Sequence, residues 1–138
     1  MWIRRLEVTH CAGIAAASVD LEPGLNVLYG PNELGKSTLA AAIRAALLLQ
    51  SQSTAAEPLS DWHTDALPEV TLTFEQERGH NWRIRKRFGG SGGYAYLDFS
   101  RDGRDFTQDS RGREVDGALQ ALLRWGIEAP GGRRGRRG

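Results

Sequence analysis

Residues 30–38 form a segment whose residue types and spacing specify a chemical task. They read Gly-Pro-Asn-Glu-Leu-Gly-Lys-Ser-Thr and fill every constrained position of the pattern G-x-x-x-x-G-K-[ST]. Gly30 and Gly35 lack a Cβ, so the backbone can turn sharply and its amides can approach phosphate closely. Lys36 would bring a positive charge to the β- and γ-phosphates, and the Ser37 hydroxyl would ligand Mg²⁺. The segment therefore predicts a phosphate-binding loop.

The elements on either side of this loop are those that such a loop requires. Residues 25–29 are a short, mostly apolar run, as expected of a buried strand. Apolar residues then recur at helical spacing as far as about Leu49, so the loop should open a helix whose N-terminus favours anions. A glycine-rich turn ahead of an ordinary helix is the alternative, and the full order of strand, loop and helix argues against it. The residues expected to contact the nucleotide are Gly30, Pro31, Asn32, Glu33, Leu34, Gly35, Lys36, Ser37 and Thr38.

Length and composition set the broad class. The chain has 138 residues, 40 % hydrophobic and 25 % charged, which fits one globular domain. It contains no apolar run of membrane-spanning length, and its first residues lack a signal-peptide stretch. Cys11 is the single cysteine, which excludes an intrachain disulfide and favours a reducing, cytoplasmic location. The three histidines are scattered, so we predict no zinc site.

The rest of the chain is predicted to be rich in antiparallel strands. Alternating apolar residues in 70–75 and 82–88 are typical of a hairpin with one buried face. Further strands are expected over residues 2–9, 14–21, 94–99 and 104–107, an irregular loop over 50–68, and a last helix ending near Gly126. We therefore predict one folded unit over residues 1–126 and a disordered Gly/Arg-rich tail over 127–138.

Three arginines alternate along the second strand of this hairpin: Arg83, Arg85 and Arg87. Alternate residues share one face, so three guanidiniums would line up at about 7 Å intervals, with Lys86 nearby. Such a row can meet the phosphates of nucleic acid. The alternative is a solvated strand face whose arginines pair with Glu75 and Glu77 across the hairpin.

The segment around the phosphate loop resembles a known family. The run from Glu22 to Leu39, with Pro-Asn-Glu inside the loop, is similar to the N-terminal lobe of SMC-like ATPases. These include DNA double-strand-break-repair ATPases and related bacterial AAA-type proteins with long coiled coils. The resemblance covers about residues 1–126. It implies an α/β fold: a P-loop NTPase core, the N-terminal lobe of an ABC-ATPase-like head, with an adjoining antiparallel β-sheet.

The resemblance also implies a function. SMC-like ATPases bind and hydrolyse ATP with Mg²⁺ while two heads engage on DNA, in DNA double-strand-break repair or chromosome maintenance. Asn32 would lie near the γ-phosphate, and Lys36, Ser37 and Thr38 would contact phosphates and Mg²⁺. Lys36 would also offset transition-state charge. The expected partners are DNA, a C-terminal ATPase half or a second head, and a nuclease subunit; the expected location is cytoplasmic or nucleoid-associated, with no membrane.

The sequence departs from the family pattern after the first strand and after the hairpin, where it lacks the family glutamine that would sense Mg²⁺, and two further segments only mimic family motifs. No basic residue follows the first strand, where residues 9–13 read Thr-His-Cys-Ala-Gly. Residues 94–98 mimic the strand that carries a catalytic Asp, but Phe99 stands where the family has Glu, so we expect an ordinary strand with an exposed Asp98. Ser91-Gly92-Gly93 resembles a signature triplet, but a strand-like run follows it, so we interpret it as a loop.

The family's catalytic carboxylates, signature motif and coiled coil belong to later sequence that is absent here. We therefore expect this chain to be one piece of a larger protein, and to bind ATP with little turnover. Two other functions stay open. One is a small-molecule P-loop kinase, against which the hairpin section argues. The other is a non-catalytic fragment that only docks a partner half.

Overall fold

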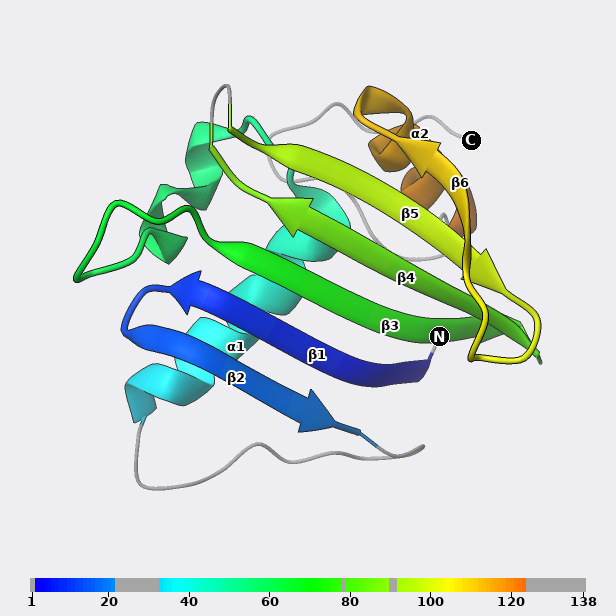
Figure 1. Ribbon diagram of the computed structural model, residues 1–138, viewed down its shortest axis with the longest axis horizontal. Helices are drawn as coiled ribbons and strands as arrows, with labels where there is room; N and C mark the ends of the chain where they lie inside the picture. Colours follow the sequence, from blue (N-terminus) through cyan, green and yellow to red (C-terminus); the bar gives the residue numbers. More distant parts are fainter. Residues whose placement is uncertain (1, 22–32, 78, 90–91, 124–138) are drawn as a thin grey trace.

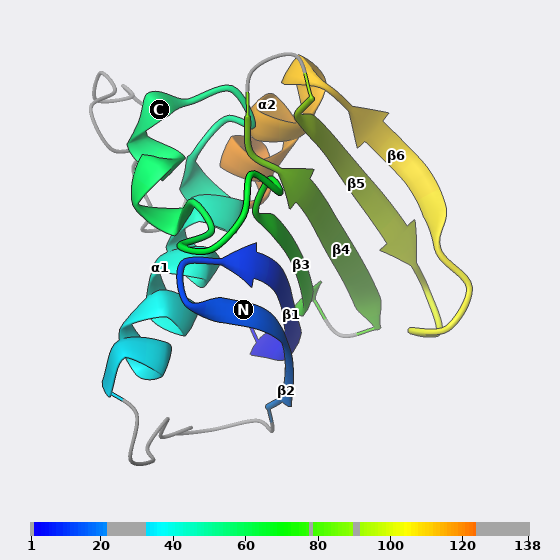
Figure 2. The same cartoon turned by 60° about the vertical axis from the view of Figure 1, so that its left-hand side comes forward.

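The computed structural model describes residues 2–21, 33–77, 79–89 and 92–123. A single antiparallel sheet of six strands, in the order β2-β1-β3-β4-β5-β6, forms the body of this part (Figure 1). Both α-helices lie behind the sheet in Figure 1, on one face, and Figure 2 shows α1 standing along that face. The strands are β1 Trp2–Cys11, β2 Ile14–Asp20, β3 Glu69–Glu77, β4 His80–Arg87, β5 Tyr94–Ser100 and β6 Thr107–Arg111. The helices are α1 Glu33–Leu48, the 3-10 helix η1 Thr54–Leu59 and α2 Arg113–Leu122.

The core lies between the sheet and the two helices. Inward-facing residues of adjacent strands stack across it, as with Leu72 opposite Ile84 in the β3–β4 pair. The predicted hairpin of residues 70–75 and 82–88 is therefore confirmed, with its apolar members on the core face. The buried apolar residues of the strands are Leu6, Val8, Cys11, Val70, Leu72, Phe74, Ile84, Ala95 and Leu97.

Helix α1 packs on the sheet through three alanines together with larger apolar residues such as Ile43 and Leu47. Ala42, Ala45 and Ala46 are at most 1 % exposed, whereas Ala40, Ala41 and Arg44 point outward. Alanine has the highest helix propensity and lets the helix axis approach the strands closely. The predicted helix to about Leu49 is confirmed to within one residue. The predicted strand of residues 25–29, the tail and the boundary near residue 126 lie outside the described residues.

The loop predicted for residues 50–68 contains η1, which the composition did not reveal. Ser53 caps it by accepting a hydrogen bond from the Ala55 amide. The end of η1 and the residues after it dock on the β1–β2 hairpin through two backbone bonds of 2.9 Å: Ala12 N donates to the carbonyl of Leu59, the last residue of η1, and Trp62 N donates to the Ala12 carbonyl. Long-range hydrogen bonds of this kind have no local sequence signal, which is why the segment was predicted to be irregular.

The final strand begins later than predicted, at Thr107 rather than Arg104. Ser100 and Asp102 hold the intervening residues in a compact turn: the Ser100 hydroxyl accepts from the amides of Asp102 and Gly103, and the Asp102 carboxylate accepts from those of Arg104 and Asp105. These bonds replace strand pairing over residues 101–105. They also lower the pKa of Asp102 to about 2, the largest cause being the Asp105 amide.

Candidate nucleotide site and nucleic-acid interface

The second half of the predicted phosphate loop forms the start of α1. The helix begins at Glu33, so Gly35, Lys36 and Ser37 belong to its first turns, while Gly30, Pro31 and Asn32 lie outside the described residues. Of residues 33–36 the structure describes the backbone but not the side chains. The first amides of an α-helix have no partner within the helix, and the helix dipole gives this end a partial positive charge. Phosphate is the ligand that such an end favours.

Ser37 and Thr38 point in different directions from α1. Ser37 is exposed, whereas Thr38 is 9 % exposed and faces the protein interior. An exposed hydroxyl beside the N-terminal amides has the chemistry of a Mg²⁺ ligand, because Mg²⁺ prefers oxygen donors and keeps several of its waters. The Ser37 side chain therefore fits the predicted metal role.

On the opposite side of the sheet, the three predicted arginines share one face. Each guanidinium lies over an aromatic ring: Arg83 over Phe106 at 4.4 Å, Arg85 over Tyr96 at 5.0 Å and Arg87 over Tyr94 at 4.9 Å. Their side chains are 33 %, 41 % and 38 % exposed in the same order. Because the described helices all cover the other face, this row stands on an open surface (Figure 1). The predicted row of arginines is confirmed.

The carboxylates that pair with this row were not the predicted ones. Asp98 Oδ2 lies 3.0 Å from both Arg83 Nη2 and Arg85 Nε, and Glu69 Oε2 lies 3.7 Å from Arg87 Nη1. Asp98 is 2 % exposed, so the prediction of an exposed Asp98 was wrong. The reason is the β4–β5 register, which sets Asp98 directly opposite Arg83 and under two guanidiniums.

Lys86 does not belong to this surface. Strand alternation turns it to the core face, where its side chain is 0 % exposed and its Nζ lies 2.7 Å from Asp116 Oδ1. Burial lowers the pKa of Lys86, against the opposing effect of Asp116. Its expected place near the nucleic-acid row was therefore wrong.

Sequence reasoning missed a second basic feature on the same open face. A groove of about 590 Å³ lies between the start of β1 and the turn before β6. A β-bulge in β1 between Ile3 and Arg5 lets two consecutive arginines, Arg4 and Arg5, line it. Its other lining residues are Trp2, Glu7, Asp20, Leu21, Thr73, Asn81, Arg83, Gly103, Arg104 and Phe106. In a regular strand, Arg4 and Arg5 would point to opposite faces of the sheet. The bulge brings both side chains to the groove, and a bulge has no clear sequence signature.

The polar groups of this groove are only partly satisfied. Arg4 donates to Asn81 Oδ1 at 3.1 Å and Arg5 to Asp20 Oδ1 at 2.7 Å. The Trp2 Nε1 donor is buried and has no hydrogen-bond partner. Four guanidiniums and two carboxylates line the groove, so its surroundings favour an anionic ligand.

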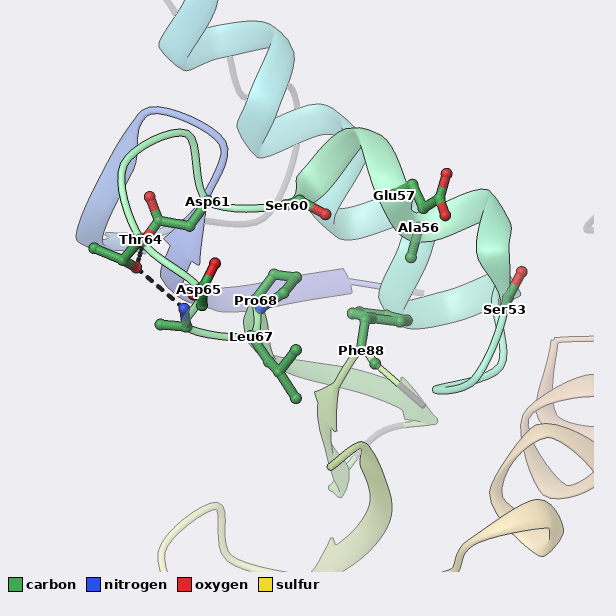
Figure 3. Close-up of a pocket in the computed structure, with 12 residues that line it drawn as sticks. Ser53, Ala56, Glu57, Ser60, Asp61, Thr64, Asp65, Leu67, Pro68 and Phe88 are labelled. Atoms are coloured by element: carbon green, nitrogen blue, oxygen red, sulfur yellow. Dashed lines mark hydrogen bonds between the residues drawn. The ribbon is translucent and has the colours of Figure 1, made fainter. Parts of the chain in front are cut away.

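A smaller cavity of about 310 Å³ lies between η1, the loop after it and Phe88 (Figure 3). Asp61 is its most constrained acid. One oxygen accepts from the His63 amide, and the other accepts from the Thr64 hydroxyl and lies 2.9 Å from His10 Nδ1. These bonds, the His63 amide first, lower the pKa of Asp61 to about 2. Its oxygens are engaged by the loop and by His10 of β1, so Asp61 acts as a structural residue.

Comparison with known proteins decides the family. Residues 5–121 match a family model described as an AAA domain. The chain belongs to this AAA domain family. Over 124 residues, 88 % of the chain, the AAA domain is 27 % identical to the DNA double-strand break repair Rad50 ATPase of Methanopyrus kandleri. Over 57 residues, 41 % of the chain, it is 39 % identical to the DNA replication and repair protein RecF of Acidothermus cellulolyticus. These matches confirm the resemblance to SMC-like DNA-repair ATPases.

A solved structure supports the fold of the AAA domain. It comes from work on "ATP-driven dimerization and DNA stimulated activation of SMC ATPases", with a TM-score of 0.63 and 19 % identity. The superposition covers 88 % of this chain and 79 % of that chain, which confirms the predicted α/β, P-loop NTPase-like fold. The matched regions are 14 % and 15 % of the lengths of the two curated relatives. Within the described ranges, no helix combines the length and apolarity needed to cross a membrane.

Proposed function

We propose that this AAA domain binds Mg-ATP through residues 30–38, as the N-terminal lobe of an SMC-like ATPase that acts in DNA double-strand-break repair or chromosome maintenance. The observation that carries the proposal is the position of the motif at the N-terminus of α1, with Ser37 exposed there. The amides of the first helical turn would hold the phosphates, Lys36 would neutralise charge on them, and Ser37 would ligand Mg²⁺.

Hydrolysis would need groups from outside this lobe. Asp98, which lies within the mostly apolar strand β5, is the residue singled out by its resemblance to a catalytic carboxylate, and it lies on the face of the sheet opposite α1, 3.0 Å from two arginines. Asp98 therefore cannot orient water at the phosphate site. A C-terminal ATPase half or a second head would supply that residue, and the lobe alone would bind ATP with little turnover.

Thermal unfolding tests nucleotide binding directly. Mg-ATP at about 100 times its Kd should stabilise the chain by about 2.7 kcal/mol, which corresponds to roughly 10 °C in Tm. Lys36→Ala should abolish the shift while leaving the Tm without nucleotide unchanged. A melting temperature that Mg-ATP does not move would refute the proposal and favour a fragment that only docks a partner half.

We also propose that the open face of the sheet contacts DNA in the assembled protein. The support is the row of Arg83, Arg85 and Arg87 together with the adjoining groove, which gathers three further arginines beside the aromatic side chains of Trp2 and Phe106. Guanidiniums can bind backbone phosphates, and aromatic rings can stack on bases. A nuclease subunit as a further partner and a nucleoid-associated location follow from the same family role.

A small-molecule P-loop kinase is the competing enzyme class. Such kinases interleave helices with parallel strands, whereas all strand pairs within the described ranges are antiparallel. Transfer of phosphate from ATP to a small acceptor by the purified chain would favour the kinase.

A further inference from the structure

Lys86 joins the far end of α1 to two other elements. From the core face of β4, its Nζ donates to the Leu49 carbonyl at 2.6 Å and to Asp116 Oδ1 of α2 at 2.7 Å. Leu49 follows the last residue of α1, and its own amide still donates to the Ala45 carbonyl. The ammonium group thus ties the C-terminal end of α1 to β4 and α2.

The charges around Lys86 alternate in sign. The C-terminal end of α1 carries a partial negative charge, and the ammonium group beside it is positive. Asp116 is negative and lies in the first turn of α2, where the helix dipole is positive. This arrangement compensates a cation that is 0 % exposed, and it gives the end of α1 a side-chain hydrogen bond to the sheet.

We infer that Lys86 is a positioning residue for the phosphate site at the opposite end of α1. The helix is a rod of 16 residues, about 24 Å long at 1.5 Å per residue, which packs through buried Ala42, Ala45, Ala46 and Leu47, with Leu39, Ile43 and Leu48 partly buried beside them. Apolar contacts have no directional requirement, whereas a hydrogen bond requires a defined distance and angle, so a small shift of the helix along the sheet costs the hydrogen bond more. The polar anchor at Leu49 therefore fixes how far the first turn of α1 reaches toward a bound triphosphate. This inference rests on the proposed binding of ATP at residues 30–38.

The test compares ATP affinity in two variants that both destabilise the fold. Lys86→Met removes the anchor, whereas Leu119→Ala opens a cavity under α2 and leaves the contact between Lys86 and Leu49 in place. Each Kd for Mg-ATP is measured by calorimetry at a temperature at which circular dichroism shows the variant folded. We expect Lys86→Met to raise the Kd about tenfold. A shift of about 1 Å in the groups that contact a ligand can cost up to about a hundredfold, and the loss of the anchor should shift the first turn of α1 by less than that. Leu119→Ala should stay within about twofold, and Lys86→Arg, which keeps a donor, should recover most of the affinity.

A second variant covers the case in which Lys86→Met does not fold. The double variant Lys86→Met/Asp116→Leu removes both buried charges, a change that folds often tolerate, and still leaves the Leu49 carbonyl without its donor. Its Kd should also rise about tenfold. Parental affinity in either anchor variant would overturn the inference about Lys86 and leave the proposed function standing. Absence of Mg-ATP binding by the parent chain would overturn the proposed function together with the inference.

Discussion

Arg83 and Asp98 occupy directly opposed positions on β4 and β5, with Nη2 3.0 Å from Oδ2. The same carboxylate oxygen lies 3.0 Å from Arg85 Nε, so one buried acid serves two guanidiniums on the open face. Asp98 therefore holds two of the three guanidiniums of the basic row and offsets part of its charge, while Arg87 pairs with Glu69.

Asp98→Asn should lower the free energy of unfolding by about 1–2 kcal/mol, because two guanidiniums lose their charged acceptor in a partly buried setting. Urea denaturation measures this change. Asp105→Asn is the matched control, since Asp105 is exposed and only its backbone amide is bonded. Equal stability of the two variants would show that the Asp98 contacts contribute nothing.

Neutralising the row should weaken DNA binding in a salt-dependent way. In Arg83→Gln/Arg85→Gln, the slope of log K against log[salt] should become shallower by about 1.8, as each phosphate contact contributes about 0.9. Glutamine is preferred to glutamate because two glutamates would place two further carboxylates beside Asp98. Arg44→Gln, exposed on α1 on the other side of the sheet, is the control. An unchanged slope in the double variant would remove this face from the proposed interface.

The proposed metal role of Ser37 predicts a magnesium-dependent difference. Chelation of Mg²⁺ with EDTA should weaken ATP binding by the parent chain. Ser37→Ala should bind ATP more weakly in Mg²⁺ and respond less to EDTA, because its metal ligand is already gone. Calorimetric titrations with and without EDTA measure both effects. Identical responses in parent and variant would assign Mg²⁺ to other ligands.

Purified chain should release little phosphate from ATP, since the acid of β5, Asp98, is held by Arg83 and Arg85 on the face of the sheet away from α1. A coupled phosphate-release assay measures the rate. Lys36→Ala provides the background, because it should abolish any turnover at the proposed site. Hydrolysis by the parent chain well above that background would contradict the requirement for a second half.

Acid should destabilise the loop after η1 through Asp61. Its pKa is lowered from 3.8 to about 2, so its ionised form contributes stability that is fully present above pH 3.8 and is lost as pH falls through about 2. The difference in unfolding free energy between the parent chain and Asp61→Asn should therefore shrink over that range. Urea titrations at several pH values measure it. A difference that does not vary with pH would assign the role of Asp61 to hydrogen bonding by either protonation state.

The elements with strong periodicity could be predicted from the sequence. The β3–β4 hairpin and α1 carry their burial pattern in consecutive residues, and the phosphate motif marks its own chemistry. Features that depend on distant partners could not be predicted: η1 against the β1–β2 hairpin, Asp98 beneath two arginines, and Lys86 between Leu49 and Asp116. Lys86 shows the difficulty, because its strand position indicates the core whereas its charge suggests the surface.

The aromatic rings beneath Arg83, Arg85 and Arg87 have a consequence for recognition. A free arginine side chain samples many rotamers, and fixing it on a ligand costs conformational entropy. Here each guanidinium already lies over a ring, so much of the side-chain entropy is lost before a ligand binds. The face therefore presents guanidiniums at fixed positions. It favours ligands whose negative charges have the same spacing over flexible polyanions of equal charge.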